Sequence, residues 1–204
     1  MEADDSTTHQ SMWPSRFETP FVETRPFQGA WAAKRTDERL YRMIRGFHEA
    51  GDLLATEGAG DARRAQNLLY PAIFNYRQSL ELHLKYLLMA YGPLVGEKPD
   101  FQNHGLRGLW GKCKRVISCL EGRPEPSDPD AFRAVDAQIA EFDATDPGSY
   151  SFRFAHNTKG DAIDLTISEI NLPNLRTVMA SLHNFLECID LHLHCGCGVP
   201  RCAH

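Results

Sequence analysis

The sequence predicts an all-α fold, a bundle of four or five helices joined by short connections. Apolar residues recur every three or four positions over most of the chain, which is the period of a helix, and glycine and proline interrupt these segments. Only residues 150–167 alternate in the manner of a strand, and they are the place where we expect a small β-hairpin. Short connections between long amphipathic helices are typical of bundles.

The most regular apolar pattern lies in residues 70–91, and we expect the other helices to pack around this segment. Pro71 suits a first helical turn, because the N–H that it lacks would have no partner there. Three charged residues at four-residue spacing follow one edge of the apolar stripe: Arg77, Glu81 and Lys85. A guanidinium beside such a stripe is either paired or used in chemistry, since an uncompensated buried charge costs several kcal/mol.

The other helices begin at residues that favour a helix N-terminus and stop at glycine or proline. Thr36 is the expected cap of the first helix and Asp130 that of the fourth. The expected ranges, besides the central helix, are 36–57, a short lead-in at 62–69, 105–121, 130–144 and 171–194.

Composition indicates an ordinary globular protein of 204 residues with a formal net charge of −5. We divide it into an irregular, aromatic-containing arm (1–34), the helical bundle (35–194) and a Cys/His-rich tail (195–204). No apolar run of about 18 residues exists, so no contact with a membrane is predicted. The acidic N-terminus does not resemble a secretory signal, which favours a cytoplasmic location with reduced cysteines. The net negative charge argues against broad binding to nucleic acid but leaves room for a local basic cleft.

Three motifs occur in order: Arg77-Gln-Ser-Leu-Glu-Leu-His-Leu-Lys85, His104-Gly-Leu-x-x-Leu-Trp110, and Asp146-Pro-Gly-Ser-Tyr-Ser-Phe-Arg-Phe154 with a trailing Lys159-Gly160. Followed by a closing amphipathic helix, they resemble the bacterial HEPN superfamily over about residues 36–194. The resemblance implies a metal-independent endoribonuclease that works as a homodimer, often in toxin–antitoxin or phage-defence loci. Members that lack the active residues imply the alternative, a non-catalytic protein- or RNA-binding and dimerisation module.

HEPN nucleases use an arginine followed, after four to six residues, by a histidine, and the chain offers two such pairs. Arg176 and His183 lie in the last helix, where the family usually has its motif, and they project from one side roughly 10 Å apart along the axis. Arg77 and His83 in the central helix are the alternative pair, about 120° apart around the axis. Histidine exchanges protons near neutral pH, and a guanidinium stabilises a phosphate whose charge is increasing. A purely structural ion pair of Arg77 with Glu81, with Lys85 beside them, is the competing interpretation.

Two further groups complete the candidate sites. Arg153, His156 and Lys159 place cations on one loop and, with His104, would bind the phosphates of an RNA substrate; His104 is alternatively a helix cap. Thiolates and imidazoles of the tail (Cys195, Cys197, Cys202 and His204) would suit zinc, although a reduced tail without metal is the simpler interpretation. No other cofactor is expected. The expected partners are RNA, a second copy of the chain, and a protein partner such as an antitoxin.

Overall fold

The computed structural model describes Pro20, Phe21, Ala30 and residues 32–123, 126, 128–165 and 167–197. Within these residues the chain is helical and contains no β-strand, which confirms the predicted all-α bundle. It forms two compact units, Met1–Ala32 and Ala33–His204. The helices belong to the second unit: α1 (Thr36–Ala59), α2 (Ala62–Tyr91), the 3-10 turn η1 (Gly92–Val95), α3 (Leu106–Glu121), α4 (Pro129–Thr145) and α5 (Leu172–Cys197).

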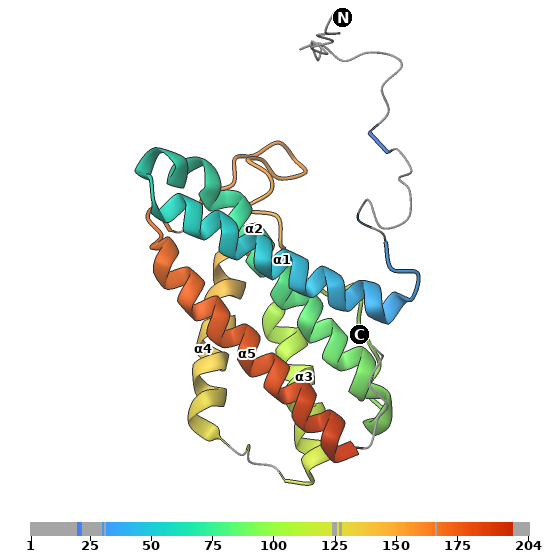
Figure 1. Cartoon of the computed structure of the whole chain (residues 1–204). Coiled ribbons are helices and arrows are strands. Elements are labelled where there is room, and N and C mark those ends of the chain that lie inside the picture. Colours follow the sequence, from blue (N-terminus) through green and yellow to red (C-terminus); the bar gives the residue numbers. More distant parts are fainter. Residues whose placement is uncertain are drawn as a thin grey trace, which may run out of the picture. The chain divides into compact units, whose positions relative to one another are not determined.

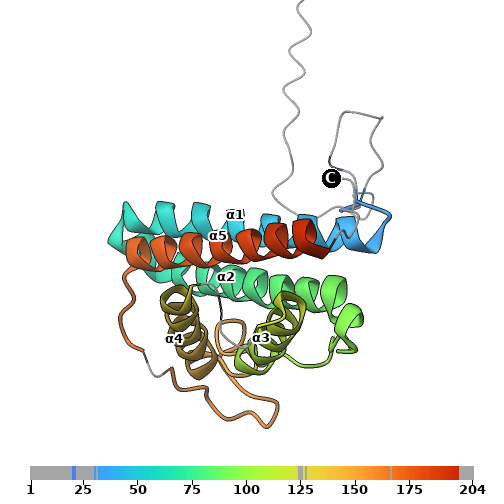
Figure 2. The same cartoon turned by 90° about the horizontal axis from the view of Figure 1, so that it is seen from below.

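α2 lies in the middle of this unit. α1 and α2 form an antiparallel pair joined at Gly60 and Asp61, and α5 runs across both (Figure 1). α3 and α4 cover the opposite side of α2 from α1 and α5 (Figure 2). Because α2 is covered on both sides, polar residues on it are buried unless a neighbouring element leaves an opening.

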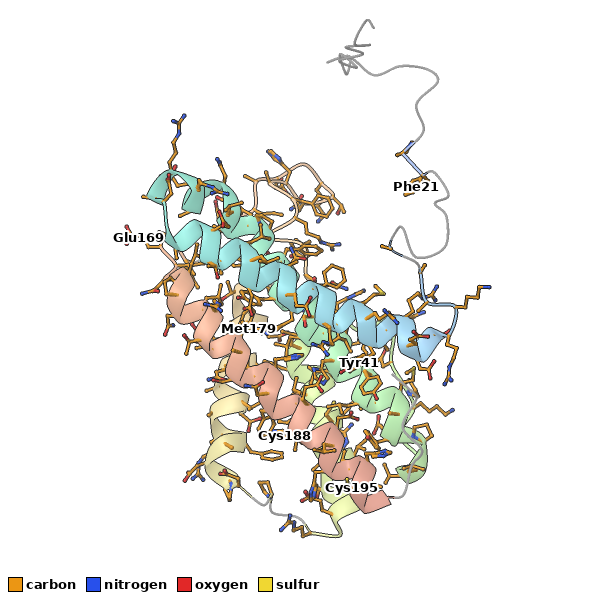
Figure 3. The ribbon with its side chains drawn as sticks, viewed as in Figure 1. Phe21, Tyr41, Glu169, Met179, Cys188 and Cys195 are labelled. Atoms are coloured by element: carbon orange, nitrogen blue, oxygen red, sulfur yellow. The ribbon has the colours of Figure 1, made fainter. Side chains whose placement is uncertain are left out.

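The core contains apolar residues from α1 to α5, and α2, α3 and α5 contribute equally to its buried members. Met179 on α5 is among the buried residues of this core (Figure 3). Burying one leucine- or methionine-sized side chain contributes about 1.5–3 kcal/mol, so this cluster supplies most of the driving force for folding. The buried members on α2 are Tyr76, Leu80, Leu84, Leu87, Leu88 and Tyr91.

The lead-in predicted at 62–69 and the central helix are one continuous helix, so the prediction that Pro71 lies in a first turn is wrong. Proline removes one intrahelical hydrogen bond, to the carbonyl four residues earlier. That carbonyl belongs to Asn67, which is exposed, so water can replace the missing donor. The carbonyl of Pro71 itself accepts a hydrogen bond of 2.7 Å from the side chain of Asn75.

Two predicted helix caps differ in the structure. Thr36 is the first helical residue of α1, and Arg35 precedes it without capping through its side chain. The carboxylate of Asp128, rather than that of Asp130, caps α4 by accepting a hydrogen bond from the N–H of Ala131, because Pro129 is suited to the first turn.

The expected hairpin near residues 150–167 is reduced to one isolated antiparallel bridge between His156 and Ala162. The side chain of Asn157 accepts hydrogen bonds from the backbone of Lys159 and Asp161, so this segment closes as a tight turn instead of continuing as two strands.

The last helix, α5, extends to Cys197, past the predicted start of the tail at residue 195. None of the helices described here is long and apolar enough to cross a bilayer.

Candidate functional site

Two groups of polar side chains are buried against α2. We call the first the ionic network: Arg77, Glu81, Lys85, His104 and Asp146. The second is the histidine cluster: His48, His83, His183 and Glu187. Each brings α2 together with segments distant in sequence, and each contains residues that the sequence marks as candidates.

The guanidinium of Arg77 is the centre of the ionic network and is fully buried. It donates to the carbonyl oxygen of His104 at 2.6 Å, to that of Asp146 at 3.2 Å and to the carboxylate of Glu81 at 3.3 Å. Burial lowers the pKa of Arg77, and the carboxylates of Glu81 and Asp146 oppose that change. Arg77 therefore ties α2 to two loops and is not accessible to a substrate.

Glu81 links this interior to the surface. Its carboxylate is buried and accepts a hydrogen bond from Lys85 at 2.8 Å, while the Nδ1 atom of His104 lies 2.9 Å from the same oxygen. The His104 side chain is 57% exposed. The network thus ends in an imidazole that a buried carboxylate orients and that solvent can reach.

The loop after α4 docks on the same network. One carboxylate oxygen of Asp146 accepts hydrogen bonds from the backbone of Tyr150 and Ser151, both at 2.9 Å. Ser149, directly before Tyr150, has a φ of 58°, a left-handed conformation that costs a non-glycine residue roughly 1–2 kcal/mol. The guanidinium of Arg153 then lies over the rings of Phe74 and Phe154. Arg77 in this way holds the segments that carry His104 and Arg153.

His156 and Lys159 are exposed on the turn that follows. No salt bridge within the described residues ties either side chain to a carboxylate, in contrast to Lys112 and Lys114. Their placement leaves them available to an anionic ligand. The predicted substrate-binding residues therefore include exposed His156 and Lys159 on the turn, and His104 and Arg153 on the two segments that Arg77 anchors.

The histidine cluster lies where α1, α2 and α5 meet. The ring of His183 on α5 stacks on His48 of α1 with 4.2 Å between centroids, and it contacts His83 of α2 at 5.6 Å. Burial is the main cause that lowers the pKa of His83 to about 3, and nearby His183 and His48 contribute to the same shift. Burial is also the main cause that lowers the pKa of His48 and of His183, so the three imidazoles are neutral at pH 7.

Carboxylates surround this cluster. Asp52 accepts a hydrogen bond of 2.7 Å from the Tyr76 hydroxyl and lies 3.8 Å from the Arg176 guanidinium. Glu187 lies 3.9 Å from the Nε2 atom of His183. The ligating atoms of His83, His183 and Glu187 all lie within 4.8 Å of one another.

The two predicted Arg/His pairs are thus rearranged. His83 and His183, taken from different pairs, meet in the histidine cluster, whereas Arg77 belongs to the ionic network. Arg176 is exposed on α5, with Asp52 beside its guanidinium. Sequence reasoning missed His48, although its position four residues after buried Ile44 places it on the inner face of α1.

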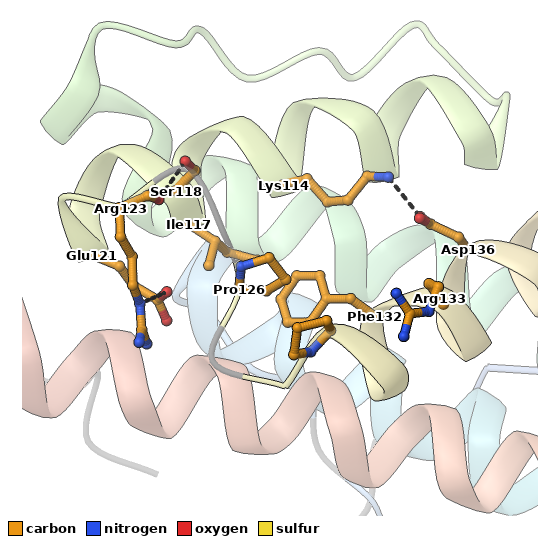
Figure 4. A pocket seen from close by; sticks show the side chains of 10 residues that line it. Lys114, Ile117, Ser118, Glu121, Arg123, Pro126, Phe132, Arg133 and Asp136 are labelled. Carbon is orange, nitrogen blue, oxygen red and sulfur yellow. Dashed lines mark hydrogen bonds and ion pairs between the residues drawn. The ribbon is translucent and has the colours of Figure 1, made fainter.

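A separate pocket of about 320 Å³ lies between α3 and α4 (Figure 4). Its charged side chains are matched with opposite charges: Lys114 pairs with Asp136 at 2.6 Å and Arg123 with Glu121 at 2.9 Å. The pocket therefore presents little uncompensated charge to a ligand.

The tail residues predicted to bind zinc are only partly described. Cys195 is an exposed free cysteine in the last turns of α5 (Figure 3). The side chain of Cys197, and Cys202 and His204 entirely, lie outside the described residues.

The chain matches no family model, no curated protein and no solved structure. The HEPN resemblance therefore stays a prediction, and function has to be argued from the geometry.

Proposed function

We propose that the protein is a HEPN-like, metal-independent endoribonuclease in which His104 is the general base. The observation that supports this proposal is the contact of an exposed imidazole, through Nδ1, with the buried carboxylate of Glu81 at 2.9 Å. A carboxylate that holds Nδ1–H fixes the ring and the tautomer, and leaves Nε2 to accept a proton from a substrate. Arg77 and Lys85 form ion pairs with the same carboxylate from the interior, at 3.3 Å and 2.8 Å.

The proposed reaction uses the 2′-hydroxyl of the RNA as nucleophile. His104 Nε2 removes its proton while the 2′-oxygen bonds to phosphorus, and the bond from phosphorus to the 5′-oxygen breaks. The leaving oxygen takes a proton from the imidazolium, which yields a 2′,3′-cyclic phosphate and a 5′-hydroxyl end. Acid–base help of this kind contributes about 10²–10⁴-fold. Arg153 supplies the guanidinium for the phosphate oxygens, and His156 and Lys159 contact the flanking backbone.

The pair Arg176 and His183 is a weaker candidate for this role. Asp52 lies beside the Arg176 guanidinium and offsets its charge toward a phosphate. The ring of His183 is stacked on His48, and its lowered pKa makes it a poor proton donor at pH 7. The homodimer, the toxin–antitoxin or phage-defence setting and the cytoplasmic location belong to the same proposal.

A second candidate is a non-catalytic HEPN-like module that binds RNA or protein and dimerises. It is favoured by the extent to which the ionic network satisfies its own charges, since such a network is equally suited to holding two loops in place. In that case His104 and Arg153 would bind a partner without breaking a bond.

Incubation of the purified protein with labelled single-stranded RNA in EDTA separates these candidates. We expect cleavage to cyclic phosphate ends, and a loss of about 10²-fold or more in His104→Gln, which keeps a side chain able to bond Glu81. The matched control, Arg176→Ala with His183→Ala, should keep its activity. RNA binding without cleavage by the wild type would select the RNA-binding module. Neither binding nor cleavage would reject both the ribonuclease and the RNA-binding module. Sedimentation of the same samples reports whether the chain is a dimer.

A further inference from the structure

The histidine cluster has no role in the chemistry proposed above. It contains two imidazoles and a carboxylate whose ligating atoms converge, on helices that are far apart in sequence. We propose that His83, His183 and Glu187 bind one divalent first-row transition-metal ion of the Zn²⁺ class, with His48 as the fourth ligand. The ion would join α5 to α2, so we assign it a structural role.

The donor atoms suit this class of ion. Two imidazole nitrogens and one carboxylate oxygen are a common ligand set for zinc and its neighbours, whereas Ca²⁺ and Mg²⁺ prefer oxygen ligands only. His183 and Glu187 are four residues apart on α5, so they lie on one face of that helix. His83 approaches them from α2.

The distances between the ligating atoms are close to those of a metal site. In a tetrahedral zinc site with bonds of about 2.0–2.1 Å, ligand atoms are roughly 3.4 Å apart. In this protein the Nε2 atom of His183 lies 3.9 Å from Glu187, and the three ligating atoms are within 4.8 Å of one another. Small rotations about side-chain bonds are enough to close this set on an ion.

His48 supplies a second, independent indication of a ligand. Its Nδ1 atom is buried and has no hydrogen-bond partner, which is costly for a polar atom in the interior. The ring stacks on that of His183, one of the three converging residues, with 4.2 Å between centroids. A metal ion that takes His48 as a ligand would give this ring a polar partner.

The site is also accessible to an ion. His183 and Glu187 side chains are 18% and 35% exposed, which gives an ion a route from solvent. Glu49 and Asp52 of α1 attract a cation electrostatically, while Arg45 opposes it.

Titration of the full chain, stripped of metal, with Co²⁺ tests the proposal. We expect one ion per chain, visible bands typical of tetrahedral nitrogen and oxygen ligands, and no thiolate charge-transfer band. Zn²⁺ should displace Co²⁺. Zn²⁺ at 100 times its dissociation constant should raise the melting temperature by roughly 5–10 °C.

Variants decide which residues hold the ion. Glu187→Gln and His183→Gln are both at the accessible side and should each weaken binding at least about tenfold. Circular dichroism of the apo variants establishes that they fold. The control replaces Cys195, Cys197 and Cys202 by serine and His204 by glutamine, and should bind as the wild type does.

Loss of binding in that control, or unchanged binding in both cluster variants, would overturn the proposal, as would absence of binding by the wild type. RNA cleavage in EDTA should be unaffected, so this site and the proposed active site succeed or fail separately.

Discussion

The ionic network and the histidine cluster each include residues of α2 and of other segments, yet they satisfy their polar atoms in different ways. Arg77 places its donors on three different acceptors, and Glu81 takes up Lys85 and His104. In the histidine cluster, His48 has a buried nitrogen without a partner, and the ion-pair distances of His48 and His183 are both 3.9 Å.

This difference shows which of the two buried polar groups stabilises the fold and which one can bind a ligand. A network whose members all have partners holds loops in place, and only its exposed end, His104, is free to take part in chemistry. A cluster with loose contacts and an unsatisfied atom is still open to a ligand. We therefore expect chemistry at His104, the exposed end of the ionic network, and ligand binding inside the histidine cluster.

The largest effect is expected from Arg77→Met, which removes the cation at the centre of the ionic network. It removes the buried guanidinium that faces the carboxylates of Glu81 and Asp146, and breaking a buried ion-pair network in this way costs about 3–5 kcal/mol. Urea denaturation measures the free energy of unfolding. Arg176→Met, which removes an exposed arginine beside Asp52, should change it by less than about 1 kcal/mol. Equal effects of the two variants would mean that the network does not stabilise the fold.

The second largest loss of stability is expected from Gly51→Ala, which disturbs the packing of α1 on α2 beside the histidine cluster. A Cβ atom at Gly51 of α1 would lie 2.7 Å from the Tyr76 ring, which contacts His48. Gly51→Ala should therefore push α1 from α2 and destabilise the protein by about 2 kcal/mol. Gly46→Ala on the same helix meets no atom within 4 Å and should stabilise it by up to about 1 kcal/mol. Thermal unfolding of both variants measures the difference, and a stable Gly51→Ala would show that the two helices are less closely packed than described here.

Much of the fold was predictable, because it rests on local patterns. The apolar spacing on α2 and the glycine and proline interruptions are sufficient to predict a helical bundle. The errors were also local: Pro71 inside a helix, Asp128 in place of Asp130 as a cap, and one bridge in place of a hairpin.

The candidate site was less predictable, because it depends on which helices meet. The sequence shows that Arg77, Glu81 and Lys85 share one edge of a helix, but not that the backbone of His104 and Asp146 completes their network. Likewise, the spacing within α5 gives no information that His183 packs on His48 of α1. Spacing within one helix therefore could not identify these two groups, since both are built between elements.

The pH dependence of stability distinguishes the histidine cluster from the ionic network. The pKa of His83 is about 3 when folded and about 6.5 when unfolded, so the unfolded state binds more protons between these values. The stability that His83 contributes is complete above pH 6.5 and is lost as pH falls. In EDTA, the free energy of unfolding should decrease by about 1 kcal/mol from pH 7 to pH 5.5 through His83 alone. The lowered pKa values of His48 and His183 add to it. His83→Asn should flatten this dependence and exposed His156→Asn should not.

The smallest change in stability is expected from Arg153→Gln and Arg176→Gln. Comparing the two variants is also the most direct test of where RNA binds. Both arginines are exposed and both variants lose one charge, so stability should fall by less than about 1 kcal/mol in each. Only Arg153 lies on the loop that Arg77 anchors beside His104. Loss of one phosphate contact on single-stranded RNA lowers the slope of log affinity against log salt by about 0.7. Fluorescence anisotropy at several salt concentrations should show that change for Arg153→Gln and none for Arg176→Gln. The reverse result would move the RNA-binding face to α1 and α5, and with it the proposed base from His104 to His183.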